Sequence, residues 1–157
     1  MDGHHRLRRG RWSETGRFYL VTTATRNRQA FFGEWAIAAA AARAMASRKA
    51  WPTSGLLCWV LMPDHWHGVV ELGPESLELA IGRAKAVVSR DVGRVLGRAL
   101  SLWDPCFHDR ALRRDESVRR VARYVIANPL RAGLVRQIGD YPFWDAVWLG
   151  QGSGAAL

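Results

Sequence analysis

Two histidines, His65 and His67, stand on either side of Trp66. The preceding pair Pro63-Asp64 is typical of a tight turn, and residues 65–72 are typical of a strand. Because successive strand side chains point to opposite faces, both imidazoles would point the same way and Trp66 the other way. Two neighbouring neutral imidazoles can bind one divalent metal ion. From these residues alone, a chance His-x-His at the start of a strand is the alternative.

A tyrosine and an asparagine stand four residues apart on a predicted helix. Tyr124 and Asn128 would then lie one above the other on one helix face, and the carboxamide oxygen of Asn128 could be a third metal ligand. A tyrosine hydroxyl has a pKa of about 10 and is a poor nucleophile. A metal ion that polarises a phosphate would assist its attack. The alternative is that Tyr124 only packs on a sheet and that Asn128 only ends the helix before Pro129.

The charge of the chain favours a nucleic acid as partner. The net charge is +9, and of the 23 basic residues only Lys49 and Lys85 are lysines. Arginine binds phosphate with a planar, forked guanidinium and can stack on bases, although a GC-rich genome would also raise the arginine content. The eight tryptophans add surfaces for base stacking, but most are expected in the core. An anionic membrane or an acidic protein is the alternative partner.

Length and composition predict one folded domain. With 157 residues, of which 48% are hydrophobic, the chain can fill one core. We expect a basic arm over 1–16, the domain over 17–149 and a flexible tail over 150–157. No apolar run approaches the length of a membrane span or forms a signal core, so we expect a cytoplasmic protein. Cys58 and Cys106 lack a metal-binding spacing and are expected to be buried thiols.

The elements that position these residues are expected in the order β-α-β-β-α-β-α. Strands are predicted over 18–25, 56–62, 65–72 and 107–112, and helices over 34–49, 77–96 and 116–127. Ser76 and Asp115 are the expected helix caps, and the aromatic segment 141–148 should pack on the domain. We therefore expect an α+β fold, a ferredoxin-like antiparallel sheet with helices on one face.

Four sequence blocks together resemble the HUH single-tyrosine transposases, most closely their REP-associated tyrosine transposase branch. HUH stands for His-hydrophobic-His, and Trp66 satisfies the middle position. The resemblance extends over about residues 9–148. The blocks are GRFYLVTT at 16–23, VLMPDHWH at 60–67, FHDRALRR at 107–114 and YVIANPLRAGLV at 124–135.

The resemblance implies the HUH endonuclease fold and a set of site residues. His65, His67 and Asn128 would bind Mg²⁺ or Mn²⁺, and Tyr124 would be the nucleophile. In this family the tyrosine displaces a 3′ hydroxyl of single-stranded DNA and forms a 5′-phosphotyrosine link, which a 3′ hydroxyl later reverses. No nucleotide cofactor is needed, in agreement with the absence of a P-loop sequence. The expected partner is a REP-like DNA hairpin with a 5′ guide tetranucleotide, bound by a monomer, with a dimer as the alternative.

Further residues are expected to contact DNA. Lys85 matches a lysine of similar proteins, with a solvated helix face as the alternative. Arg131 follows the tyrosine helix and could reach a phosphate. His108 is expected to contact a base or to be a structural histidine rather than a metal ligand.

We also expect DNA to lie near the basic arm and near a glycine that follows the two histidines. In the arm, Arg8, Arg9 and Arg11 could follow a DNA backbone, or belong to a charged tail without a specific role. Relatives commonly have a bulky apolar residue after the second histidine, where this chain has Gly68. A glycine there could let the DNA backbone approach closely.

Two other function classes are compatible with the same residues. A metal-dependent hydrolase would need more ligands than His65 and His67, and only His108 and the arm histidines His4 and His5 are left. A DNA-binding module without catalysis would use Tyr124 to stack on a base. A covalent protein–DNA adduct would distinguish the transposase from both.

Overall fold

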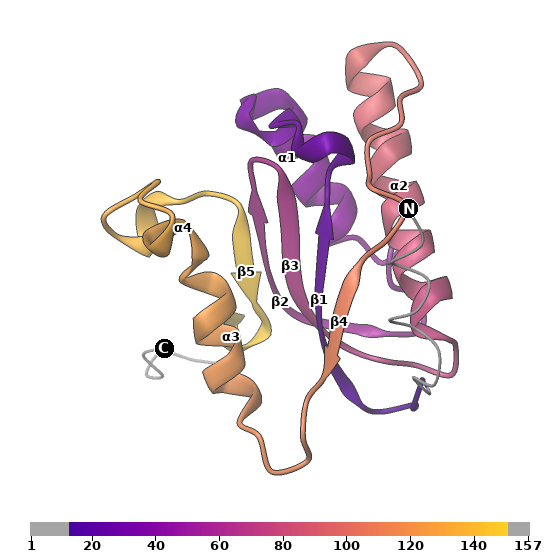
Figure 1. Ribbon diagram of the computed structural model, residues 1–157, viewed down its shortest axis with the longest axis vertical. Helices are drawn as coiled ribbons and strands as arrows, with labels where there is room; N and C mark the ends of the chain where they lie inside the picture. Colours follow the sequence, from indigo (N-terminus) through magenta and orange to yellow (C-terminus); the bar gives the residue numbers. More distant parts are fainter. Residues whose placement is uncertain (1–12, 151–157) are drawn as a thin grey trace.

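The computed structural model describes residues 13–150 and is built around a five-stranded sheet (Figure 1). All neighbouring strands are antiparallel, in the order β4-β1-β3-β2-β5. The strands are β1 (Phe18–Ala24), β2 (Gly55–Met62), β3 (His65–Glu71), β4 (His108–Ala111) and β5 (Trp144–Ala146). The α-helices are α1 (Trp35–Met45), α2 (Leu77–Leu96), α3 (Val118–Ile126) and α4 (Asn128–Arg131). The α+β fold with an antiparallel sheet is confirmed.

The two ends of the chain are described only in part. The predicted arm residues Arg8, Arg9 and Arg11 and the tail after residue 150 lie outside the described residues. Residues 13–16 are bonded to the domain: Gly16 N donates to the Leu72 carbonyl at 2.7 Å. Within residues 13–150, no helix has both the length and the apolarity needed to cross a membrane.

The helices cover both faces of the sheet, so the prediction of one covered face is wrong (Figure 1). On one face, α1 and α2 pack against alternate residues of the strands, such as Leu61 and Trp66. On the other face, α3 packs against Val60 and Val69. Helical periodicity reveals which side of a helix is apolar, but it does not reveal which face of a sheet the helix covers. Because α3 covers this second face, the second half of β2 is buried on both faces.

Capping residues set the starts of α2 and α3. As predicted, Ser76 caps α2, with its Oγ accepting from Leu79 N at 3.2 Å. The prediction that Asp115 caps the next helix is wrong. Helix α3 begins after Ser117, whose Oγ accepts from Arg120 N. The side chain of Glu116 is held instead by Arg110 of β4, through contacts of 2.8 and 2.9 Å. This ion pair keeps residues 113–116 in a turn.

The helix that carries Tyr124 ends before Asn128 rather than including it. Ala127 forms the junction, with φ −75° and ψ −1°, and α4 begins at Asn128. Pro129 lies in the first turn of α4, where the missing proline N–H leaves no helical hydrogen bond unmade. Tyr124 and Asn128 thus lie on two successive helices, about one turn apart.

The aromatic tail packs on the domain, as predicted, and adds an unpredicted edge strand. This strand, β5, pairs with β2 and is only three residues long, too short for an alternating pattern to show. The tail is also anchored to Leu61, whose N donates to the Phe143 carbonyl at 2.8 Å. The hydroxyl of Tyr141 donates to the Leu61 carbonyl. These bonds fix the end of β2 beside the turn that leads to His65.

Trp66 occupies the space that Gly68 leaves open. A Cβ built on Gly68 would lie 2.2 Å from Cη2 of the Trp66 indole. Both residues face α1 and α2, where the indole also stacks on Trp51 with ring centres 6.1 Å apart. The hypothesis that Gly68 admits the DNA backbone is therefore wrong, because a buried side chain fills that space.

Candidate metal and tyrosine site

Strand β3 places His65 and His67 on the face that α3 covers. They alternate with Trp66, and Val69 further along the same face packs against α3. The two imidazole centres are 4.5 Å apart, with the ring planes at 87°. The prediction that both rings point to one face is confirmed.

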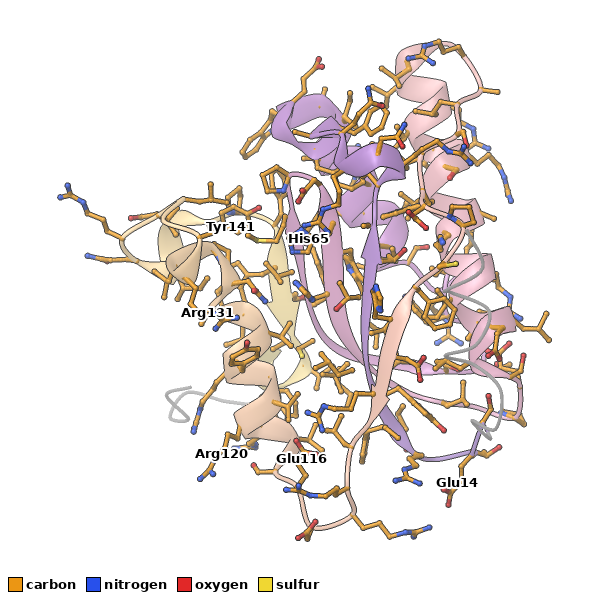
Figure 2. All side chains as sticks on the ribbon, viewed as in Figure 1. Glu14, His65, Glu116, Arg120, Arg131 and Tyr141 are labelled. Atoms are coloured by element: carbon orange, nitrogen blue, oxygen red, sulfur yellow. The ribbon has the colours of Figure 1, made fainter. Side chains whose placement is uncertain are left out.

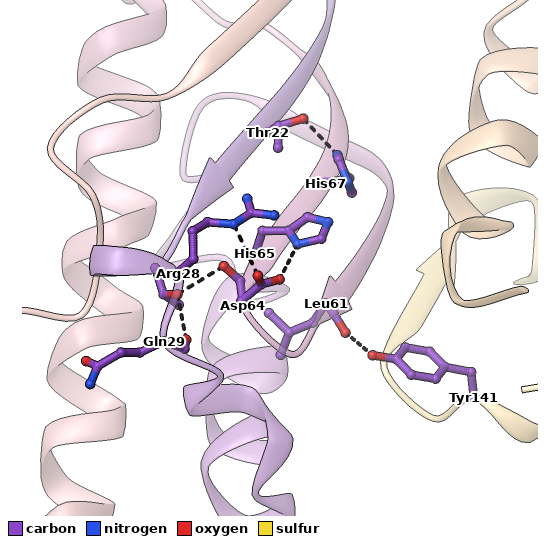
Figure 3. A network of polar contacts seen from close by, with 9 residues as sticks. Thr22, Arg28, Gln29, Leu61, Asp64, His65, His67 and Tyr141 are labelled. Carbon is purple, nitrogen blue, oxygen red and sulfur yellow. Dashed lines mark hydrogen bonds and ion pairs between the residues drawn. The ribbon is translucent and has the colours of Figure 1, made fainter. Parts of the chain in front are cut away.

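The Nδ1 atom of each imidazole is held by a different neighbour (Figure 3). His67 Nδ1 lies 2.7 Å from Thr22 Oγ1, and Thr22 is the residue of β1 directly opposite His67. His65 Nδ1 lies 2.6 Å from Asp64 Oδ1. With a proton on each Nδ1, both rings donate to these oxygens and present the lone pair of Nε2. In this tautomer the two Nε2 lone pairs would be available to a metal ion.

Burial keeps His67 in its neutral form. Desolvation, together with the positive charges of His65, Arg131 and Arg28, lowers the pKa of His67 to about 3, against the opposing effect of Asp64. An imidazole with this pKa is neutral near pH 7, as a metal ligand must be.

Of the three tyrosines in the chain, Tyr124 is the one exposed to solvent. Its side chain is 62% exposed and its ring lies under the guanidinium of Arg131, 3.9 Å from the ring centre. Tyr19 is buried, and its hydroxyl accepts from Glu14 N at 2.9 Å. Burial raises the pKa of Tyr141 to about 12, and its hydroxyl is held by a backbone carbonyl. Tyr124 is therefore the tyrosine whose side chain is accessible from solvent.

Arg131 lies against Tyr124. Its guanidinium stacks on the ring, and its positive charge is one of the causes that lower the pKa of His67. Figure 2 shows Arg120 and Glu116 near the lower end of α3, Arg131 of α4 beyond its upper end, and His65 on the neighbouring sheet. Helix α3 itself packs on β2 and β3.

Asn128 is the remaining predicted ligand. Its amide nitrogen donates to the Val125 carbonyl at 2.8 Å, which turns the carboxamide oxygen away from that carbonyl. Within residues 13–150, no group of three or more His, Cys, Asp or Glu side chains is arranged to hold a metal ion. Two imidazole nitrogens and one amide oxygen fit Mn²⁺ and, less well, Mg²⁺, which prefers oxygen. Water or phosphate oxygens would complete the coordination.

The predicted DNA contacts fall on different parts of the fold. His108 is exposed on β4 opposite Thr22, so it lies on the sheet face of the two metal-site histidines. Lys85 belongs to α2, on the other side of the sheet. Its ammonium donates to the carbonyls of Asp104 and Cys106, at 2.7 and 3.5 Å. The structure thus gives Lys85 a role in holding the loop before β4, and its contact with DNA stays a prediction.

Several residues of the site were not identified from the sequence. Thr22 could not be found, because its pairing with His67 depends on the register of β1 and β3. Asp64 precedes His65 directly, and a carboxylate next to a histidine is a signal that could have been used. An arginine-rich surface, which we call the α3 basic face, was also missed. Its members are the exposed residues Arg113, Arg114, Arg119, Arg120 and Arg123.

Comparison with known proteins confirms the resemblance to REP-associated tyrosine transposases. No protein-family model matches the sequence. A REP-associated tyrosine transposase of Escherichia coli K12 is 29% identical over 85 residues, which are 54% of this chain and 50% of that protein. The match thus spans half the length of that relative. A solved structure of a REP-associated tyrosine transposase bound to a REP hairpin superposes with a TM-score of 0.63, at 22% identity, over 85% of this chain and 79% of the other.

Proposed function

We propose that this protein nicks and rejoins single-stranded DNA at REP-like hairpins, as an HUH single-tyrosine transposase. One observation carries the proposal: α3, whose exposed Tyr124 stacks against Arg131, covers the sheet face on which His65 and His67 lie. A nucleophile candidate and a two-imidazole site thus share one side of the sheet. The resemblance to REP-associated tyrosine transposases supports the same function.

The metal site would consist of His65 and His67 through their Nε2 atoms and of Asn128 through its carboxamide oxygen. A bound Mg²⁺ or Mn²⁺ would draw negative charge off the phosphate under attack. Thr22 and Asp64 fix the orientation of the two rings before any ion arrives. Hydrogen bonds that orient a ligand ring before the ion binds raise metal affinity.

The chemical step would begin with the Tyr124 hydroxyl. Its oxygen attacks the phosphorus of a phosphodiester and its proton passes to solvent. The bond from phosphorus to the 3′ oxygen breaks, and that oxygen leaves with the electron pair and takes up a proton. The DNA on the 3′ side of the nick is then linked to the tyrosine through its 5′ phosphate. A 3′ hydroxyl reverses the step, and the number of phosphate ester bonds is constant, so no ATP is required.

The α3 basic face would bind the DNA backbone. Its five arginines are exposed beside Tyr124 or just before α3, and arginine forms bidentate contacts with phosphate. The solved relative is bound to a REP hairpin. We propose a REP-like hairpin with a 5′ guide tetranucleotide as the substrate, bound by a monomer in the bacterial cytoplasm at the nucleoid.

Two measurements test the proposal. Titrations at matched salt should show tighter binding of a palindromic hairpin with a single-stranded 5′ extension than of a duplex of the same length. Binding should weaken steeply with salt, because each phosphate contact releases counterions. With Mn²⁺, the hairpin should also become attached to the protein in a form that survives denaturing electrophoresis. Cleavage without attachment would favour the hydrolase, and binding without cleavage would favour the non-catalytic module.

A further inference from the structure

The segment from Thr25 to Gln29 holds the turn that precedes His65. Thr25 N donates to the Asp64 carbonyl at 2.9 Å. The buried Thr25 hydroxyl lies 3.0 Å from the same carbonyl and 2.7 Å from the carbonyl of Gln29 (Figure 3). The backbone of Asp64 is therefore fixed by a segment outside the hairpin to which it belongs.

This segment contains two consecutive residues in an unfavourable backbone conformation. Asn27 and Arg28 have φ angles of 55° and 54°, in the left-handed region that suits glycine. Non-glycine residues keep such angles where surrounding contacts impose them, often at functional sites. At residue 28 the side chain makes such a contact, with the carboxylate of Asp64.

The side chain of Arg28 completes a chain of contacts to His65. Arg28 Nε lies 3.1 Å from Asp64 Oδ2, and the other carboxylate oxygen, Oδ1, lies 2.6 Å from His65 Nδ1. Figure 3 shows the guanidinium beside the His65 ring. With one oxygen on each partner, the carboxylate cannot rotate without breaking a charged contact. Arg28 therefore restricts the angle at which Asp64 holds the imidazole.

We propose that Arg28 is a positioning residue of the metal site, which acts on His65 through Asp64. The left-handed backbone at residue 28 brings the guanidinium to the carboxylate, and the carboxylate orients the His65 ring, whose Nε2 would bind the ion. The inference rests on the proposed function in one respect, that a metal ion binds at His65 and His67.

Substitutions with glycine separate the role of the side chain from that of the backbone. Arg28→Gly removes the guanidinium, but glycine suits a φ of 54°, so the metal-free protein should melt no lower than wild type. Asn27→Gly is the matched control, because it relieves the same backbone conformation one residue earlier and leaves the Arg28–Asp64 pair in place. Mn²⁺ affinity is measured without DNA, from the paramagnetic resonance signal of the free ion.

Arg28→Gly should weaken Mn²⁺ binding about tenfold, the lower end of the range for loss of a residue that orients a metal ligand. Asn27→Gly should bind as wild type does, and Arg28→Lys should recover part of the loss by keeping a cation near Asp64. Asp64→Asn should also weaken binding. The double variant Arg28→Gly/Asp64→Asn should bind Mn²⁺ as tightly as Asp64→Asn alone, because both changes act through one carboxylate.

The inference is wrong if Arg28→Gly binds Mn²⁺ with wild-type affinity, or if the losses from Arg28→Gly and Asp64→Asn multiply. Failure of the proposed function would look different. In that case wild type itself would show no Mn²⁺ binding that depends on His65 and His67, which would overturn the metal site and this inference together.

Discussion

The guanidinium carbon of Arg131 lies 3.9 Å from the centre of the Tyr124 ring. Such a cation–π contact joins α4 to α3 and restrains an aromatic ring that is otherwise surrounded by solvent. It makes Arg131 the residue that holds the proposed nucleophile in place.

Arg131→Ala should therefore slow DNA cleavage by about two- to fivefold, since an exposed cation–π contact contributes about 0.5–1 kcal/mol. The rate is measured in single-turnover assays with saturating hairpin, so that a loss of DNA affinity does not contribute. Arg136→Ala is the control, because it removes another exposed arginine downstream of α4. An equal loss of rate in Arg136→Ala would show that the cleavage rate depends on the positive charge of this region and not on the contact between Arg131 and Tyr124.

Thr22→Val should weaken Mn²⁺ binding about tenfold and leave the fold intact, because it removes the hydroxyl that orients His67 and keeps the volume of the side chain. Titration with Mn²⁺ measures the effect. Unchanged affinity would mean that Thr22 does not orient the ring.

Thr23→Val, the matched control on the other face of β1, should leave Mn²⁺ affinity unchanged. The Thr23 hydroxyl is buried without a hydrogen-bond partner, so its removal should stabilise the protein by about 1 kcal/mol. Urea unfolding measures the change in free energy. A lower stability of Thr23→Val would contradict this interpretation of the buried hydroxyl.

Gly68→Ala should destabilise the protein by about 1–3 kcal/mol, the range for overpacking a core, because the new methyl would collide with Trp66. The collision disappears in a Trp66→Val background, where Gly68→Ala should cost much less. Urea unfolding of the two single variants and of the double variant gives the coupling between the positions. Additive effects would mean that the indole does not impose glycine at residue 68.

Glu116→Gln should make the folded protein less stable near neutral pH. The stability of the variant should also fall less steeply than that of wild type as the pH is lowered. The hydrogen bond from Arg110 lowers the pKa of Glu116 from 4.5 to about 2. Because the folded protein has the lower pKa, this stabilisation is present above about pH 4.5 and is lost as the pH falls towards 2. Thermal melts across this range measure it, with the exposed Asp115→Asn as control. If wild type and Glu116→Gln melt in parallel from neutral pH to pH 2, the ion pair does not stabilise the fold.

The sequence predicted the features that depend on local pattern. The helix from Leu77 to Leu96, its cap Ser76 and the common direction of His65 and His67 follow from short-range periodicity and capping chemistry. Local pattern did not predict the features that depend on contacts between distant parts of the chain. Two examples are the packing of α3 on the second face of the sheet and the pairing of Thr22 with His67.

The left-handed backbone of Arg28 is a clear case of this limit. No local pattern predicts arginine in that conformation, because its stabilising partner Asp64 lies on a different part of the chain. Ser117 illustrates a competition between signals. Asp115 and Ser117 are both good caps, and the pairing of Glu116 with Arg110 decides between them.

The identity of the residue that becomes linked to DNA tests the central claim most directly. Wild type and Tyr124→Phe are incubated with Mn²⁺ and a cleavable hairpin, and the linked peptide is identified by mass spectrometry. Tyr141→Phe serves as control, since the Tyr141 hydroxyl is held by the Leu61 carbonyl. We predict that the DNA 5′ phosphate is attached to Tyr124 in wild type and in Tyr141→Phe, and that Tyr124→Phe binds the hairpin but forms no link. Attachment at another residue, or cleavage of the hairpin by Tyr124→Phe at the wild-type rate, would contradict the account.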